Sequence, residues 1–146
     1  MYIISACLVG ENVKYNGGNN DTPWVKKFAQ EHHCYFCCPE ILGGQPCPRP
    51  PAERVGDKIV NTRGEEGTES FVVGAALAWK AAKEQAARWG EDIEGAILKS
   101  KSPSCGRGKI YDGTFSHQLV DGDGEFVKLL RENGIEIITE KEKIDD

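Results

Sequence analysis

The chain has 146 residues, and its 18 Lys and Arg against 23 Asp and Glu give a formal net charge of −5. This length suits one domain with its own core, so we expect residues 1–146 to form a single domain, and the acidic balance disfavours a nucleic-acid partner bound through a basic face. No segment is apolar for long enough to span a bilayer, and Met1–Ser5 lacks the basic region of a secretory signal, so we expect a cytoplasmic protein with no membrane partner.

The first third of the chain is predicted to form a strand, a helix and a second strand. Tyr2–Ile4 is an apolar strand, and Thr22–Pro23 combines a helix cap with a first-turn proline, which predicts a helix at about 22–32. Cys34–Cys38 reads as a second strand. The many prolines of residues 39–51 exclude regular structure, so we expect an ordered loop there.

The rest of the chain continues the alternation. Apolar periodicity and stop glycines predict, in chain order, a helix at 68–88, a strand at 94–100, a loop at 101–113, a helix at 123–133 and a strand at 135–139. Strands that alternate with helices in this way are typical of parallel sheets with right-handed crossovers. The predicted fold class is therefore α/β, with a doubly wound, mostly parallel sheet in a Rossmann-like three-layer arrangement.

The six cysteines are the most informative residues of the chain. Without a secretory signal, cysteines are expected to serve as metal ligands or redox groups more than as a disulfide framework. Cys7, Cys38 and Cys105 each follow a predicted strand, and the carboxyl ends of parallel strands meet at the edge of the sheet where ligands bind. We therefore predict that these three thiols converge on a metal site that keeps one open position.

Such thiolates hold either zinc or an iron–sulfur cluster, because both need soft, deprotonated sulfur. Cys34 and Cys37 have the spacing of a zinc pair, and Cys47 with His32 or His33 would complete a zinc site. Against this, neighbouring side chains of a strand point to opposite faces. The set distributed over three strand ends suits a [4Fe–4S] cluster with one free iron, which acts as a Lewis acid. Taken singly, each cysteine is more often a core residue or an idle thiol.

Polar residues near these cysteines are the candidates for catalysis. Glu40 lies two residues after Cys38 and is a candidate general base that activates water, although a loop glutamate is more often simply solvated. Ser102 and Ser104 are candidate hydrogen-bond donors to a substrate or cluster, although Ser-Pro sequences also form turns. Lys99 would either neutralise an anion or face water.

Other charged segments are given plainer interpretations. Arg49, Arg54 and Arg63 are candidates for binding an anionic ligand, but they are interpreted as surface residues, since scattered arginines usually keep their charged groups in water. Asp121–Gly124 is interpreted as a turn with a helix cap. It is not a phosphate loop, because the glycine motif is incomplete and aspartates would repel phosphate.

Three ordered groups of residues extend over nearly the whole chain: Ser5–Leu8; Cys38–Glu40 with Gly43–Pro46 and Pro48–Glu53; and Leu98–Gly106 with Tyr111–Phe115. In these groups the chain resembles the thiouracil desulfidase family. The resemblance implies a [4Fe–4S] enzyme that removes sulfur from a thiolated pyrimidine, such as thiouracil, without net redox chemistry. The partner that it implies is a small thiolated nucleobase.

The resemblance also implies a role for each candidate site residue. The cluster ligands would be three cysteines, Cys7, Cys38 and Cys105. The free iron of the cluster would bind the thione sulfur and polarise the C–S bond. Glu40 would deliver a proton or activate the water that attacks the carbon, and Ser104 and Ser102 would orient the substrate.

Two other classes of function stay open on the sequence. One is a non-catalytic module that binds zinc or an iron–sulfur cluster and recognises a partner. The other is a thiol redox protein that uses Cys34 and Cys37. An iron–sulfur cluster can also be lost in an aerobic preparation, which would leave free thiols or disulfides.

Overall fold

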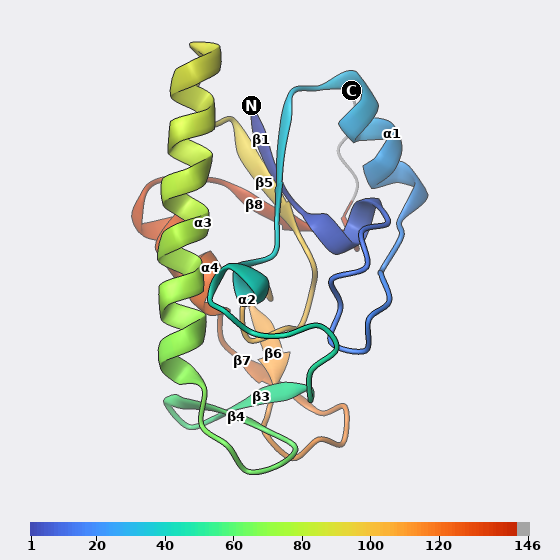
Figure 1. Cartoon of the computed structure of the whole chain (residues 1–146), viewed down its shortest axis with the longest axis vertical. Helices are drawn as coiled ribbons and strands as arrows, with labels where there is room; N and C mark the ends of the chain where they lie inside the picture. Colours follow the sequence, from blue (N-terminus) through green and yellow to red (C-terminus); the bar gives the residue numbers. More distant parts are fainter. Residues whose placement is uncertain (143–146) are drawn as a thin grey trace.

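A four-stranded parallel sheet forms the centre of the structure, a computed structural model that describes residues 1–142 (Figure 1). The strand order is β2-β1-β5-β8, and β1 pairs in parallel with both β2 and β5. The strands are β1 (Tyr2–Ser5), β2 (Cys34–Cys37), β5 (Gly95–Leu98) and β8 (Ile137–Thr139). Each lies within a strand that the sequence predicts or within one residue of it.

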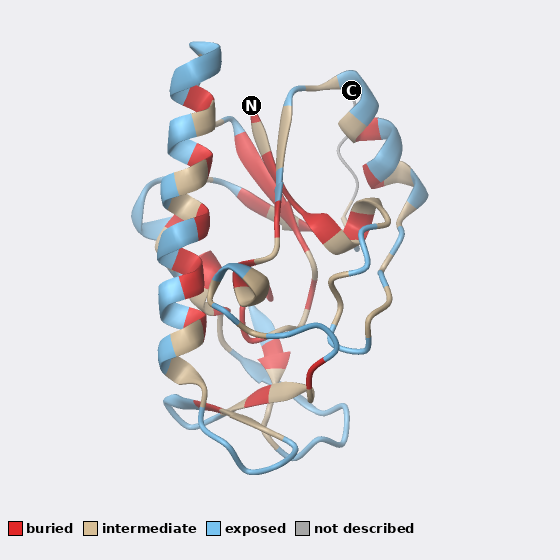
Figure 2. Cartoon of the chain, viewed as in Figure 1, coloured by how far each residue is buried: buried red, intermediate tan, exposed pale blue. Residues whose placement is uncertain are grey.

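Helices cover both faces of this sheet. On one face lies α1 (Pro23–Glu31), whose Val25 and Phe28 pack against Ile4 and other apolar residues of the sheet. On the other face lie α3 (Thr68–Trp89) and α4 (Glu125–Glu132). Figure 2 shows β1 and β5 buried between helices whose outward sides are exposed. This confirms the doubly wound, three-layer α/β fold, in which parallel strands are buried on both faces.

The long helix α3 packs closely because its inward side carries small residues. Its buried alanines recur at helical spacing, and they are Ala75, Ala78, Ala82 and Ala86. Gly90 ends the helix with a left-handed backbone, as the sequence predicts. The side chains of Phe126 and Leu130 on α4 pack into the same core.

Several short elements were not predicted. They are η1 (Ala6–Val9), α2 (Pro39–Leu42), β3 (Ala52–Val55), β4 (Lys58–Asn61), β6 (Lys109–Tyr111) and β7 (Leu119–Asp121). The prediction that prolines exclude regular structure after residue 38 is wrong for α2, because Pro39 occupies the first helical turn, where a backbone N–H is not needed. The antiparallel pairs β3–β4 and β6–β7 lie beyond the carboxyl ends of the sheet, at the lower end of Figure 1.

The winding of the chain changes direction at β1. The chain leaves β1 through α1 to reach β2 on one side, and it returns through α3 to β5 on the other side of β1. In open parallel sheets, ligands bind outside the carboxyl ends of the strands at such a switch point. The segments that follow β1 and β5 are therefore the first place to look for a site.

Within residues 1–142, no helix is both long enough and apolar enough to cross a membrane.

We expect Gly74→Ala to destabilise the protein, although alanine is the better helix former by about 1 kcal/mol. A Cβ at Gly74 would overlap the carbonyl oxygen of Pro39, where α3 packs against α2. Overpacking of this kind costs roughly 1–3 kcal/mol, and urea unfolding followed by circular dichroism measures the net effect. Ala76→Gly, on the exposed side of the same helix, is the control and should lose only about 1 kcal/mol through helix propensity. A Gly74→Ala variant as stable as the parent would contradict the close packing.

Candidate functional site

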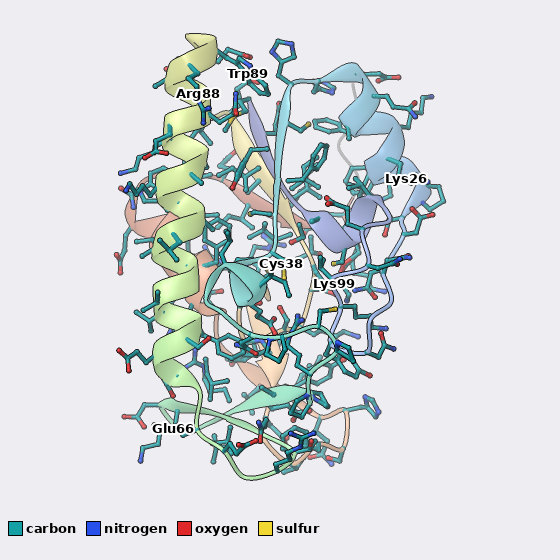
Figure 3. The ribbon with its side chains drawn as sticks, in the orientation of Figure 1. Lys26, Cys38, Glu66, Arg88, Trp89 and Lys99 are labelled. Carbon is teal, nitrogen blue, oxygen red and sulfur yellow. The ribbon has the colours of Figure 1, made fainter. Side chains whose placement is uncertain are left out.

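A cavity of about 540 Å³ opens at the carboxyl ends of β1, β2 and β5. Its walls come from the residues that follow these strands and from residues 13–15, 49–53 and 111–117. Cys38 and Lys99, which both line the cavity, lie near the centre of the molecule in Figure 3, far from Trp89 at the end of α3. The cavity therefore occupies the switch point of the sheet.

The three cysteines singled out by the sequence all line this cavity. Cys7 lies in η1 directly after β1, Cys38 caps the start of α2 directly after β2, and Cys105 lies in the segment after β5. The thiols are close enough for a charge on Cys38 to raise the pKa of both Cys7 and Cys105. The predicted convergence of the three thiols is thus present in the structure, while their role as ligands stays a prediction.

Burial raises the pKa of all three thiols, and hydrogen bonds offset part of the effect. The side chain of Asn20 stabilises the thiolate of Cys7, and the backbone N–H of Ile41 stabilises the thiolate of Cys38. The hydroxyl of Ser5 stabilises the thiolate of Cys105. Three thiolates in one buried cavity also repel one another. A cationic group bound between them would relieve both costs, because metal binding favours the deprotonated ligand.

The arrangement of the donors distinguishes a cluster from a single ion. In the described part of the chain, no three His, Cys, Asp or Glu side chains converge closely enough to hold one metal ion. Zinc would require ligand sulfurs about 2.3 Å from one point. A [4Fe–4S] cluster takes its cysteines on different iron atoms, so its ligands surround a volume. Cys7, Cys38 and Cys105 lie around a common cavity, and their soft sulfur donors suit such a cluster.

The alternative pair, Cys34 and Cys37, lies on opposite faces of the sheet. Cys34 packs in the core beneath α1, whereas Cys37 packs in the core beneath α3. Burial raises the pKa of Cys34 to about 11 and that of Cys37 well above its usual value, which is the reverse of what a reactive redox thiol needs. Cys47, the third cysteine of the alternative zinc site, is exposed and donates hydrogen bonds to backbone carbonyls. This geometry disfavours both the local zinc site and the dithiol redox site.

Glu40 lines the cavity and is held at both carboxylate oxygens. Its Oε2 accepts a hydrogen bond of 2.8 Å from Ser104 Oγ, and its Oε1 lies 3.2 Å from Arg49 Nε. Ser102 Oγ lies 3.3 Å from Ser104 Oγ and accepts the N–H of Cys105 at 2.9 Å. The structure therefore joins the predicted glutamate and both predicted serines into one chain of hydrogen bonds.

Arg49 belongs to the same chain, and its interpretation as a surface residue is wrong. Its side chain is only 4% exposed, and it also donates to the carbonyl oxygens of Pro46 and Val13 at 3.3 and 3.0 Å. The surface interpretation is wrong for Arg54 too, which pairs with Glu125 at 2.6 Å with a side chain 12% exposed.

Lys99 brings a second cation to the cavity wall. Its Nζ donates to the carbonyl and hydroxyl oxygens of Ser100 and lies 3.6 Å from the carboxylate of Glu140. The Glu140 carboxylate in turn accepts the backbone N–H of Ser100 at 2.8 Å. The charge of Lys99 lowers the pKa of Cys7, which burial otherwise raises. Of the two interpretations of Lys99, the structure favours the one in which it faces an anion.

Aromatic side chains also line the cavity, and sequence reasoning assigned no role to them. They are Tyr15, Tyr111, Phe115 and His117. Tyr111 and Phe115 belong to a stretch that carries the family resemblance, which was the only signal for them.

Fold and site together define an α/β protein with a thiol-lined cavity at the switch point of a parallel sheet. A family model described as 2-thiouracil desulfurase matches residues 2–142. The uncharacterized protein YbbK of Bacillus subtilis (strain 168) is 39% identical over 152 residues, covering 97% of each chain. The solved structure of the [4Fe-4S]-dependent thiouracil desulfidase TudS is similar with a TM-score of 0.84 and 39% identity, over 96% of this chain and 90% of that one. The chain belongs to the 2-thiouracil desulfurase family, which confirms the resemblance.

We expect Arg49→Met to lower the free energy of unfolding by roughly 3 kcal/mol, because removing one partner of a buried ion pair leaves the other charge uncompensated. Urea unfolding of the cluster-free protein measures the change. Arg63→Met, at an exposed arginine of the same region, should stay within about 0.5 kcal/mol of the parent. Equal effects of the two substitutions would show that Arg49 does not hold Glu40.

Proposed function

We propose that this protein is a [4Fe–4S]-dependent desulfidase that hydrolyses the C–S bond of a thiolated pyrimidine such as thiouracil, with residues 1–146 acting as one domain. The observation that carries the proposal is one cavity that gathers three separate thiols and the Glu40–Ser104 pair at the switch point. Membership of the 2-thiouracil desulfurase family and the similarity to the desulfidase TudS support it.

Cys7, Cys38 and Cys105 are the proposed ligands of the cluster. A [4Fe–4S] cluster held by three cysteines supplies an iron with an open coordination position, which is a Lewis acid for the sulfur of the substrate. The segments that carry the three thiols come from three different crossovers, so the site assembles only in the folded chain. Ser5, which stabilises the thiolate of Cys105, has its hydroxyl fixed by the N–H of Lys99.

Glu40 is the proposed general base. Arg49 anchors one carboxylate oxygen, which leaves the other directed at Ser104 and the cavity. A water molecule beside this oxygen would lose one proton to Glu40 as it attacks the carbon, and Glu40 would return that proton to the departing sulfur. The second proton would leave the new hydroxyl group as the C=O bond forms, and it would complete hydrogen sulfide. The balance is C=S and water giving C=O and hydrogen sulfide, with no electrons gained or lost.

The remaining wall residues position the substrate. Ser104 and Ser102, linked to each other at 3.3 Å, present hydroxyl groups next to Glu40 for the polar edge of the ring. Lys99 offers a positive charge where negative charge develops on the ring during attack. The cytoplasmic location and the lack of nucleic-acid and membrane partners stay predictions.

The ligand set can be tested by anaerobic iron–sulfur reconstitution of three proteins. We expect the parent to take up a four-iron cluster, with iron and sulfide assays and a visible spectrum as the readout. The Cys7→Ala, Cys38→Ala, Cys105→Ala triple variant should take up none, because the cavity loses its sulfur donors.

The matched control replaces the three other cysteines, Cys34, Cys37 and Cys47, by alanine. This variant should load like the parent, although Cys37 also lines the cavity. Loss of the cluster in the control, or equal loading of both triple variants, would assign the ligands elsewhere.

The role of Glu40 can be tested with Glu40→Gln, which keeps the shape of the side chain and removes its basicity. We expect the turnover of 2-thiouracil to fall roughly 10²- to 10⁴-fold, with unchanged iron content. Glu132→Gln, at an exposed position on α4, should retain full activity. Full activity of Glu40→Gln would remove Glu40 from the reaction, and a parent with a cluster but no turnover would favour a non-catalytic binding module.

A further inference from the structure

The loop between β6 and β7 carries two aromatic residues to the cavity in an unusual backbone conformation. Phe115 and His117 line the cavity and have φ angles of +56° and +62°. Bulky residues rarely adopt this left-handed region, and they keep it only where the surroundings hold them there. Contacts with the rest of the protein must therefore hold the loop, residues 112–118, in this shape.

A buried carboxylate supplies these contacts. Glu53 on β3 is buried, and its Oε1 accepts the backbone N–H groups of Gly113 and of Phe115, each at 3.1 Å. Gly113 has a φ of +94°, and a Cβ there would overlap the carbonyl oxygen of Arg54. The loop is thus pressed against β3 and hydrogen-bonded to it, which fixes the direction of Phe115.

Two tyrosines line the same cavity as Phe115 and His117. We call Tyr15, Tyr111, Phe115 and His117 the aromatic slot. The Tyr111 and His117 rings meet edge to face with centroids 6.1 Å apart. Tyr15 comes from a different segment, and its backbone carbonyl accepts the N–H of Arg49 at 2.6 Å. The slot is therefore tied to the same arginine that holds Glu40.

The rings are available to a ligand. Tyr15 is 41% exposed and Phe115 is 36% exposed, so neither is a core residue of the described chain. An aromatic face that stays accessible at a cavity wall stacks well on a flat heteroaromatic ring, and base–aromatic stacking is tolerant of the ring's substituents.

We propose that the aromatic slot selects substrates by stacking on a flat heteroaromatic ring, so that the protein accepts aromatic thiones and discriminates against thioamides without a ring. This inference rests on the proposed function, which places the thione at the thiol end of the same cavity. Phe115 and Tyr15 determine specificity, and Glu53 is a positioning residue that acts through the loop.

Binding of uracil to the reconstituted protein tests the slot without turnover, because uracil has the ring but no sulfur to remove. Isothermal titration calorimetry should show binding to the parent, and Phe115→Leu should weaken it roughly tenfold. Phe115→Tyr keeps a ring and should bind within about twofold of the parent. Tyr15→Leu, on a separate segment, should also weaken binding and serves as the second variant if Phe115→Leu does not fold. Val120→Ala, half-exposed on β7 outside the cavity lining, should bind like the parent.

Steady-state kinetics with two substrates provide a second test of the aromatic slot. For 2-thiouracil, Phe115→Leu should raise KM roughly tenfold with little change in kcat, since stacking is present before and during the reaction. For thioacetamide, which has the C=S group but no ring, kcat/KM should be unchanged by Phe115→Leu. If the role of Phe115 were merely structural, Phe115→Leu would lower kcat/KM for both substrates together.

The outcomes separate this inference from the proposed function. Three outcomes would overturn the proposed stacking, whatever the turnover. Phe115→Leu could bind uracil like the parent, Phe115→Leu and Phe115→Tyr could weaken binding equally, or the parent could fail to bind uracil. The expected pattern of uracil binding without any desulfurisation of 2-thiouracil would support the slot and overturn the proposed function.

Discussion

The parallel pairing of β1 with both β2 and β5 is the constraint on which the rest of the structure depends. It directs all the carboxyl ends to one edge, so the residues that follow these strands must meet there. Helices cover both faces of the sheet, which leaves that edge as the accessible side of the central strands. Cys7, Cys38 and Cys105 are far apart in sequence, and this pairing is what brings them to one cavity.

Charge at this edge is balanced in pairs. Arg49 is paired with Glu40, and Lys99 is paired with Glu140, so each of these two cations has its own carboxylate. Neither cation is therefore free to neutralise three thiolates in full. Burial and the charges of the neighbouring thiolates raise the pKa of these thiols, and a bound cationic group between them would favour their charged forms together. The wall is built for a group that supplies its own positive charge.

The sequence predicted what depends on local pattern and missed what depends on distant partners. Apolar periodicity located the main strands and helices, and their ends located the cysteines, because these signals lie within a few residues. The burial of Arg49 could not be read locally, since its partners Val13 and Glu40 lie 36 and 9 residues away. Among the hairpin strands that were missed, β7 is exposed throughout and has no alternation of apolar and polar residues to detect.

The thiols and the aromatic side chains of the cavity have different structural origins, and this bears on how such a site varies. The thiols and Glu40 lie in segments that follow strands of the sheet, whereas most of the aromatic slot comes from the β6–β7 hairpin and its loop. Glu53 lies on β3 beside the cavity and holds the loop through two backbone N–H groups. Substitutions in the hairpin can therefore change the aromatic part of the lining without moving the thiols, since none of the proposed cluster ligands belongs to it. The loop itself cannot move away from Glu53 without cost, because the buried carboxylate of Glu53 would then lose its two hydrogen-bond donors.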